Sequence, residues 1–317
     1  MDKFKIVGGT PLSGEIPVSG SKNSALPALA ACLLTEEPVV LRRIPRVKDI
    51  GTMQSLLEYS GAKLSVDEGE IFVHARYLDR PEAPYDVVKT MRASSLVLGP
   101  LVARTGRARV SMPGGCAIGA RPINMHVSAL EQLGATIVTT HGYVEAQAPD
   151  GLRGASIQFD RITVTGTEDV LMAAVLARGQ TLIRNAAREP EVKDLAELLN
   201  KMGAKIEGAG TSLIKVEGVE KLHGAEHTII PDRIETGTFV LAAAISRGDV
   251  TISGCNAEHI AALTVKMQRA GAEVDESQAG ALRVRCLGRP KAIDMTTEEF
   301  PGFATDLQAQ YMAWMTV

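Results

Sequence analysis

A cysteine, an arginine and a lysine carry the side chains in this sequence that are best suited to chemistry on an anionic substrate. The stretch SMPGGCAIGARP, residues 111–122, places Cys116 directly after two glycines and five residues before Arg121. Glycines allow a backbone to approach a ligand closely. Arg121 and Lys22, if they converge on Cys116, would favour its thiolate and hold a negatively charged substrate. The alternative interpretation is a half-buried, inert cysteine.

The segment GSKNSALP, residues 20–27, opens an apolar helical pattern with Lys22 and Asn23. Ser19 and Ser21 stand where serine side chains cap the first turn of a helix. Backbone N–H groups at a helix start attract anions, so a lysine there predicts an anion site. The spacing is not that of a P-loop, in which the second glycine directly precedes the lysine. The alternative is a capped helix with a solvated lysine.

Further charged residues occupy comparable places in other parts of the chain. Arg92, Asp232 and Asp306 stand near predicted helix starts, as Lys22 does. This recurrence predicts that the helix ends converge on one site, although a single residue of this kind is more often a cap or a surface charge. Glu189 precedes an amphipathic helix, where capping is the default interpretation.

The elements that must position these side chains recur along the chain. Four helical patterns end in Gly-Ala and an extended stretch, at intervals of 73, 69 and 68 residues; the glycines are Gly61, Gly134, Gly203 and Gly271. A near-constant interval indicates a duplicated unit. Glycine at this place is typical of the left-handed residue that ends a helix. A second helix type opens each unit and is apolar nearly all round, which predicts burial on every side.

Each unit is predicted to run strand, buried helix, strand, amphipathic helix, strand. The strands that follow the buried helices are expected at Val39–Leu41, Ala108–Ser111, Thr181–Ile183 and Val250–Ile252. Buried helices surrounded by sheet indicate a helix-filled, inside-out α/β fold, whereas a doubly wound nucleotide-binding sheet has its strands inside. The interval from this strand to Gly-Ala is 20, 24, 21 and 19 residues in successive units, which predicts an insertion around Cys116.

Composition narrows the possible functions. The 317 residues predict about two domains. A net charge of −3 and 4% aromatic residues disfavour nucleic-acid partners. The start lacks an apolar signal core and the apolar runs are too short to cross a bilayer, so we expect a cytoplasmic protein with no membrane contact. Cys32, Cys116, Cys255 and Cys286 show no metal-ligand spacing, and all but Cys116 are expected to be inert.

Five motifs, in order along the whole chain, closely resemble those of the UDP-N-acetylglucosamine 1-carboxyvinyltransferases, a family of enolpyruvyl transferases. They are GSKNSALP, KTMRAS, PGGCAIGARP, PDRIETGTF and FPGFATDLQAQ. The resemblance implies two inside-out α/β barrels of three units each, with the active site between them. It also implies a first domain of residues 22–229, which carries the cysteine segment, and a second formed by residues 1–21 and 230–317. A fifth unit begins near residue 296 and the chain stops within it, so we expect this second domain to be truncated at its C-terminal end.

The resemblance also implies roles for individual residues. Cys116 matches a reactive cysteine that protonates phosphoenolpyruvate and forms covalent adducts, including that with fosfomycin. Lys22 and Arg121 match groups that hold phosphate and carboxylate, Asp306 matches the general base, and Asp232 and Glu189 match active-site acids. The contacts to the nucleotide sugar are implied for Asn23, Arg92, Arg121, Pro122, Ile123, Asn124, Met125, Arg161, Ile162, Thr163 and Val164. Asn124 stands where the family commonly has aspartate.

The implied reaction transfers the enolpyruvyl group of phosphoenolpyruvate to the 3-hydroxyl of UDP-N-acetylglucosamine, at the start of peptidoglycan precursor synthesis and without a cofactor or metal. Two alternatives stay open. The shikimate-pathway enolpyruvyl transferase shares the fold, but it lacks a cysteine segment like residues 113–122. A truncated paralogue could bind the UDP-sugar without catalysis.

Overall fold

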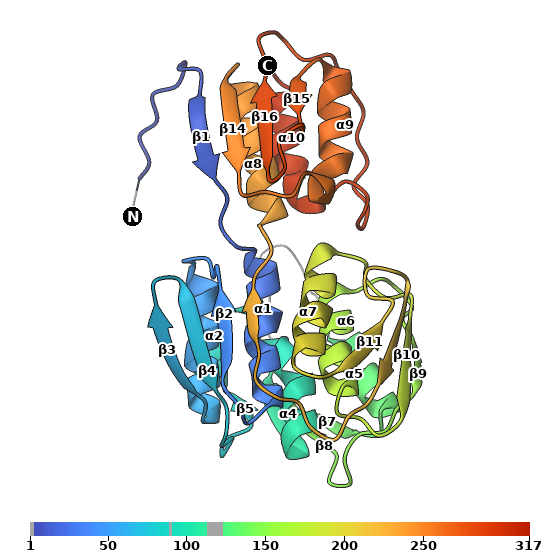
Figure 1. Ribbon diagram of the computed structural model, residues 1–317. Coiled ribbons are helices and arrows are strands. Elements are labelled where there is room, and N and C mark those ends of the chain that lie inside the picture. Colours follow the sequence, from blue (N-terminus) through green and yellow to red (C-terminus); the bar gives the residue numbers. More distant parts are fainter. Residues whose placement is uncertain (1–2, 89–90, 113–122) are drawn as a thin grey trace. The chain divides into compact units, whose positions relative to one another are not determined.

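The computed structural model describes residues 3–88, 91–112 and 123–317, and all statements below concern these residues (Figure 1). The chain divides into two compact units. The large unit comprises Gly20–Ile230, and the small unit combines the residues up to Ser19 with Pro231–Val317.

The large unit contains three sheets of four strands with the same internal order. In each sheet two strands pair in parallel and an antiparallel hairpin completes the sheet. The first sheet is formed by β13 (Glu226–Thr228), β2 (Val39–Arg42), β4 (Glu70–His74) and β3 (Lys63–Asp67). The second is formed by β5 (Glu82–Ala83), β6 (Arg107–Ser111), β8 (Tyr143–Gln147) and β7 (Thr136–Thr140). The third is formed by β9 (Ser156–Gln158), β10 (Gln180–Arg184), β12 (Leu213–Glu217) and β11 (Lys205–Glu207).

Two pairings join distant parts of the chain. Strand β13, near the end of the large unit, pairs in parallel with β2 near its beginning, with His227 opposite Leu41. Strand β1 (Ser13–Pro17) pairs in parallel with β14 (Asp249–Ser253) in the small unit, with Ile16 opposite Ile252. The small unit's sheet is completed by β16 (Ala281–Arg285) and β15 (Glu273–Asp275).

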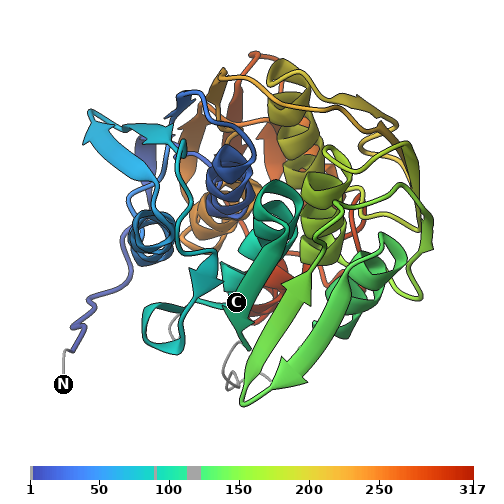
Figure 2. The ribbon, with the colours of Figure 1, turned by 90° about the horizontal axis from the view of Figure 1, so that it is seen from below.

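Helices fill the interior of the large unit (Figure 2). Helix α1 (Lys22–Ala31) is buried from Ser24 onwards, and α6 (Val164–Ala174) is buried from Gly166 onwards. The helical segment η2 (Arg92–Val97) leads into α4 (Leu98–Thr105), which contacts α6. Gly99 permits this contact, because a Cβ there would lie 2.3 Å from the Asp169 carbonyl oxygen. The predicted burial of these helices, and the inside-out α/β fold class, are confirmed.

Amphipathic helices complete the large unit. They are α2 (Lys48–Ser60), α5 (Asn124–Gln132) and α7 (Pro190–Lys201), and a short α3 (Tyr85–Val88) precedes η2. The predicted helix-ending glycines are confirmed, since Gly61, Gly134, Gly203 and Gly271 have φ of 111°, 94°, 99° and 102°. Only glycine adopts this left-handed conformation without strain.

The strands predicted after the buried helices are confirmed as β2, β6, β10 and β14. The prediction of a single strand after each Gly-Ala was wrong, because every unit has a hairpin there. Two of these hairpins turn through Glu68-Gly69 and His141-Gly142, all four residues having positive φ. Two successive residues of positive φ match the twist of paired strands, but glutamate and histidine are not the residues that usually mark such turns.

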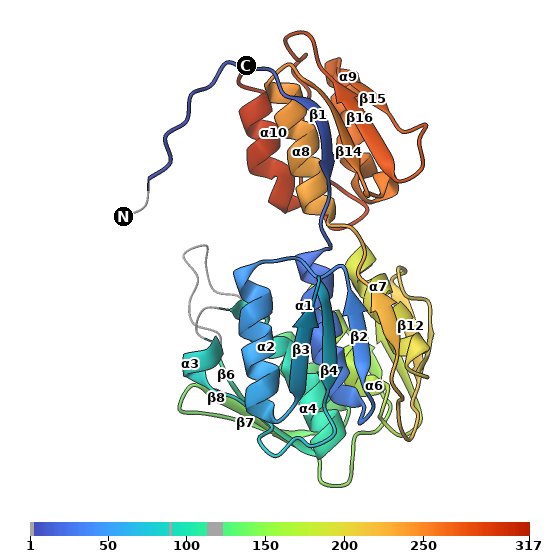
Figure 3. The ribbon, with the colours of Figure 1, turned by 60° about the vertical axis from the view of Figure 1, so that its left-hand side comes forward.

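The small unit has its own hydrophobic core. Its helices are α8 (Arg233–Ile245), η3 (Ala257–Ile260), α9 (Ala261–Ala270), η4 (Thr305–Leu307) and α10 (Gln308–Trp314). Helices α8 and α10 lie side by side (Figure 3). Trp314 is fully buried beside Tyr311, as expected for the opening helix of a fifth repeat. No helix within the described ranges is both long and apolar enough to span a membrane.

Candidate active site

The segment that carries Cys116, Arg121 and Pro122 lies outside the described residues, as does the side chain of Arg92. The bounds of the neighbouring elements still locate the insertion. Helix α2 begins six positions after β2 ends (42 to 48), and α7 begins six positions after β10 ends (184 to 190). Helix α5 begins 13 positions after β6 ends (111 to 124). The extra residues therefore lengthen this one connection.

The start of α1 carries Lys22 and Asn23. Ser21 is the N-cap, since its hydroxyl accepts a hydrogen bond of 3.3 Å from the N–H of Ser24. Ser19 does not cap this helix, contrary to the prediction, because its N–H and hydroxyl donate to Glu235 within the small unit. Asn23 is exposed. The Nζ atom of Lys22 lies 3.2 Å from Oδ2 of Asp49 in the first turn of α2, and both side chains are partly exposed.

Glu189 precedes α7 but does not cap it. Its side chain is 5% exposed, and its Oε2 atom has no hydrogen-bond partner among the described residues. The default interpretation of Glu189 as a cap was therefore wrong. The carboxylate instead lies near Glu168 of α6, a fully buried residue whose Oε1 atom also lacks a partner in the described part of the chain.

Four acids, Glu168, Asp169, Glu189 and Glu191, are buried in this part of the large unit. Loss of hydration raises the pKa of Glu168 well above its usual range, and the nearby charges of Glu191, Glu189 and Asp169 raise it further. Burial also raises the pKa of Asp169 to about 8, although the N–H of Gly99 donates to this carboxylate at 2.7 Å and opposes the shift. Burial therefore favours the protonated forms of Glu168 and Asp169.

Hydrogen bonds join the start of α6 to the segment that precedes Glu189. Thr163 caps α6 by accepting a hydrogen bond from the N–H of Gly166 at 3.2 Å. The hydroxyl of Thr167 donates to the carbonyl of Thr163 and accepts from the N–H of Ala187. Arg161 is exposed, whereas Ile162 and Val164 are partly buried against the core.

The start of α5 packs beside α6. Ile123 is buried, Met125 packs partly against the core, and Asn124 is exposed. His126, which the sequence analysis did not single out, is 4% exposed, and neither ring nitrogen makes a hydrogen bond of ordinary geometry with the described residues. Burial lowers the pKa of His126 to about 4, against a weaker opposing interaction with the Thr165 backbone. A buried, neutral histidine at a helix start is a feature that only the structure reveals.

The two remaining predicted acids belong to the small unit. Asp232 caps α8, with its Oδ1 accepting hydrogen bonds from the N–H groups of Ile234 and Glu235 at 2.8 and 2.9 Å. Asp306 is exposed in η4. The following residue, Leu307, packs on Gly237 of α8, where a Cβ would lie 2.6 Å from the leucine side chain. The fold thus brings the starts of α8 and η4 together.

The predicted site residues that the structure describes therefore fall into two groups, one in each unit. In the large unit, contacts link α1 to α2, α7 and α6, and α6 to α5 and α7. These helices carry Lys22, Glu189, Val164 and Asn124 at or beside their starts. Within the described part of the chain, no group of three or more His, Cys, Asp or Glu side chains is arranged to hold a metal ion.

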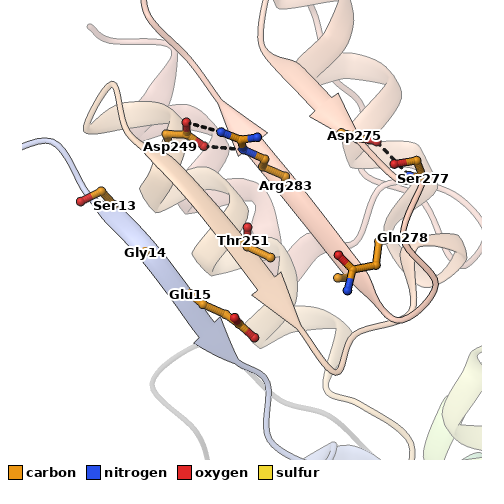
Figure 4. Close-up of a pocket in the computed structure, with 10 residues that line it drawn as sticks. Ser13, Gly14, Glu15, Asp249, Thr251, Asp275, Ser277, Gln278 and Arg283 are labelled. Carbon is orange, nitrogen blue, oxygen red and sulfur yellow. Dashed lines mark hydrogen bonds and ion pairs between the residues drawn. The ribbon is translucent and has the colours of Figure 1, made fainter.

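A hollow of about 610 Å³ lies elsewhere, on the small unit's sheet (Figure 4). Asp249 and Thr251 line it, while the alternate residues Val250 and Ile252 are buried in the core. Arg283 bridges to Asp249 through two hydrogen bonds of 2.8 Å. None of the predicted site residues lines this surface hollow, so we do not assign the site to it.

Comparison with known proteins agrees with this fold. The model of the family described as EPSP synthase (3-phosphoshikimate 1-carboxyvinyltransferase) matches residues 6–317. The chain belongs to this family of carboxyvinyltransferases. Its fold is similar to that of the enolpyruvyl transferase NikO from Streptomyces tendae, with a TM-score of 0.86, 25% identity, and coverage of 97% of this chain and 73% of the other.

Two curated relatives have a more particular name. The UDP-N-acetylglucosamine 1-carboxyvinyltransferase of Solibacter usitatus is 67% identical over 316 residues, which cover 100% of this chain and 76% of the relative. The protein of the same name from Acidobacterium capsulatum is 60% identical over 320 residues, covering 100% of this chain and 73% of the relative.

Proposed function

We propose that this protein transfers the enolpyruvyl group of phosphoenolpyruvate to the 3-hydroxyl of UDP-N-acetylglucosamine and releases phosphate. One observation carries this proposal, namely the 67% identity over the whole chain to a relative named for that activity. We further propose that the reaction takes place in the cytoplasm and supplies peptidoglycan synthesis, since it commits a nucleotide sugar to a carboxylated product.

The chemistry requires an acid, a base and cations. The sugar hydroxyl adds to the central carbon of phosphoenolpyruvate while the methylene carbon gains a proton, and phosphate then leaves as that carbon returns the proton. We assign the proton donor to Cys116 and the base that receives the hydroxyl proton to Asp306. Lys22 and Arg121 would hold the phosphate and carboxylate, because fixed positive charges stabilise the developing negative charge.

The described residues support parts of this assignment. Lys22 stands at a helix start, where backbone N–H groups add to its attraction for an anion. One carboxylate oxygen of Asp232 caps α8, and this fixes the Asp232 side chain beside the start of that helix. The exposed Asn23, Asn124 and Arg161 are proposed contacts for the nucleotide sugar, with Arg92, Arg121, Pro122, Ile123, Met125, Ile162, Thr163 and Val164. Glu189 is proposed as an acid of the active site.

Phosphate release tests the proposed function directly. The purified protein is mixed with phosphoenolpyruvate and either UDP-N-acetylglucosamine or shikimate 3-phosphate. Release with the UDP-sugar alone supports the proposal, whereas release with shikimate 3-phosphate alone assigns the protein to the activity in the family's description. Calorimetric binding of the UDP-sugar without release would instead indicate a non-catalytic binding protein.

Two variants test the assigned roles. Cys116→Ser should abolish the covalent adduct with fosfomycin in mass spectrometry, and an adduct on Cys32, Cys255 or Cys286 would refute the assignment. Asp306→Asn should lower turnover by about 10²-fold or more, in the range of general-base catalysis. Its UDP-sugar affinity should stay close to that of the unchanged protein, and equal losses in both would exclude the base role.

A further inference from the structure

A buried chain of hydrogen bonds connects the first turn of α1 to α7 and β13. The hydroxyl of Ser24 donates to Oδ2 of Asp194, and Nε2 of His227 lies 2.8 Å from Oδ1 of the same carboxylate. On the other side of the ring, Nζ of Lys201 lies 3.1 Å from Nδ1 of His227. Ser24, Asp194 and His227 are 1%, 2% and 3% exposed. No predicted site residue belongs to this chain of contacts, which we call the Ser24 network.

The donors and acceptors of the Ser24 network can be assigned from chemistry. A lysine ammonium group can only donate, so Nδ1 of His227 must accept and carries no proton. The proton of the neutral ring is then on Nε2, which donates to Asp194. Asp194 therefore accepts from both His227 and Ser24, which satisfies both of its oxygens in a site that excludes water.

The location of the network gives it a role. Ser24 is the third residue of α1, directly after Lys22 and Asn23. On the other side of this pair, the N–H of Ser21 donates to the carbonyl of Ile230 at 2.8 Å, two residues beyond the end of β13. The backbone of Gly20 also packs closely against Arg43, since a Cβ at Gly20 would lie 1.8 Å from the carbonyl oxygen of Arg43. Lys22 and Asn23 thus lie between two fixed points.

We propose that Asp194 and His227 are positioning residues that hold the first turn of α1, and so direct Lys22 and Asn23 toward the anionic substrate. This inference rests on the proposed function for its catalytic part. Asp194 is on α7, four residues after Pro190, so the same carboxylate also fixes the separation between α1 and the helix that follows Glu189. Substrate contacts hold their geometry only when such supporting hydrogen bonds are complete.

Four variants and one control test the proposal. Ser24→Ala and Asp194→Ala each remove the side-chain hydrogen bond between α1 and α7. His227→Gln retains an amide N–H near the place of Nε2 and can still donate to Asp194, whereas the shorter His227→Asn cannot. Ser60→Ala is the matched control, since Ser60 is equally buried at 1% exposed but its hydroxyl donates only to Leu56 within α2.

Two readouts separate this inference from the proposed function. The first is hydrogen exchange of the Ala25 amide, which donates to the Ser21 carbonyl at 2.9 Å and reports the first turn without any substrate. Ser24→Ala, Asp194→Ala and His227→Asn should accelerate it about tenfold, while His227→Gln and Ser60→Ala leave it within about twofold. Unchanged exchange in Asp194→Ala would overturn the positioning role, whatever the activity.

The second readout is steady-state kinetics. The three disrupting variants should raise KM for phosphoenolpyruvate about tenfold with kcat changed less than about threefold, and His227→Gln should restore KM. An equal rise of KM in Ser60→Ala, or the same KM in His227→Gln and His227→Asn, would show that the network only supports general stability. Either result would refute the inference. If the unchanged protein releases no phosphate, the proposed function and the catalytic part fail together, and exchange at Ala25 decides the structural part alone.

Discussion

Acidic side chains near the start of α6 in the large unit and near the start of α8 in the small unit have opposite environments. Both helices open a repeat; α8 has Glu235 in its first turn, and α6 has Glu168 and Asp169 in its second. Glu168 and Asp169 of α6 are buried, and each has one oxygen that lacks a partner among the described residues. Glu235 of α8 is partly exposed and accepts hydrogen bonds from Ser19.

This difference shows that neighbouring groups, rather than the place of a helix in the repeat, decide how its acids are solvated and hydrogen-bonded. Helices α1, α4, α5 and α7 contact α6 in the large unit, and burial among them removes water from its acids. At α8 the N–H and the hydroxyl of Ser19 donate to Glu235 the hydrogen bonds that water would otherwise supply. A carboxylate with donors stays ionised at little cost, whereas one without donors takes up a proton.

The largest effect should come from the charge of Asp169. Its pKa is raised from 3.8 to about 8, so the folded protein binds this proton more tightly than the unfolded chain does. The free energy of unfolding should therefore fall as pH rises from about 4 to about 8, by on the order of 5 kcal/mol. Asp169→Asn should remove this loss, and denaturant titrations at pH 5 and pH 8 measure it. An equal pH dependence in the variant would show that Asp169 is ionised in the fold.

The next effect should come from close helix packing. Gly99→Ala in α4 places a Cβ 2.3 Å from the backbone oxygen of Asp169, which cannot move away without shifting α6. We expect a loss of about 3 kcal/mol or more in the free energy of unfolding. Gly237→Ala in α8 meets the flexible end of Leu307 at 2.6 Å and should cost about 1 kcal/mol. Thermal melts of the two variants compare the units, and a larger loss at Gly237 would contradict this ranking.

A smaller effect is expected at Glu235. Glu235→Gln retains the shape of the side chain but weakens its acceptance of hydrogen bonds from the N–H and hydroxyl of Ser19. Because the residue is partly exposed, the loss should be about 1 kcal/mol. Differential scanning calorimetry should show a lower transition temperature for the small unit. Glu58→Gln on the surface of α2 provides a control, since the Glu58 side chain makes no hydrogen bond or ion pair with the described residues.

The smallest effect concerns His126 at the start of α5. Its pKa of about 4 leaves the ring neutral across the pH range in which the enzyme would work. The folded-state pKa is lowered, so this histidine should destabilise the fold only below about pH 6.5, where the unfolded chain takes up the proton first. An NMR titration of the six histidines should show one ring that stays neutral at pH 5 and disappears from the spectrum of His126→Gln. A titration midpoint near pH 6.5 for the ring of His126 would contradict this prediction.

Much of the fold follows from local pattern. The helix-ending glycines, the apolar helices and the strands after them have signatures a few residues long, which is why their places in all four repeats were predictable. The second strand of each hairpin was missed; in two of the four hairpins, Glu68 and His141 turn the chain in place of the residues that usually mark such turns. The site was predicted mainly through resemblance, since nothing local distinguishes Lys22 from any lysine at a helix start.

The sequence alone determined the repeat, the choice of buried helices and the family, because these depend on periodicity and on motifs that are contiguous along the chain. Tertiary structure alone decided that Glu189 is buried rather than a cap, that His126 is neutral, and that Ser19 and Ser21 belong to different units. It also joined Ser24 to Asp194, 170 positions away. The physical reason is that solvation and hydrogen-bond partners depend on which distant segments exclude water from a side chain, and no window of sequence contains both partners.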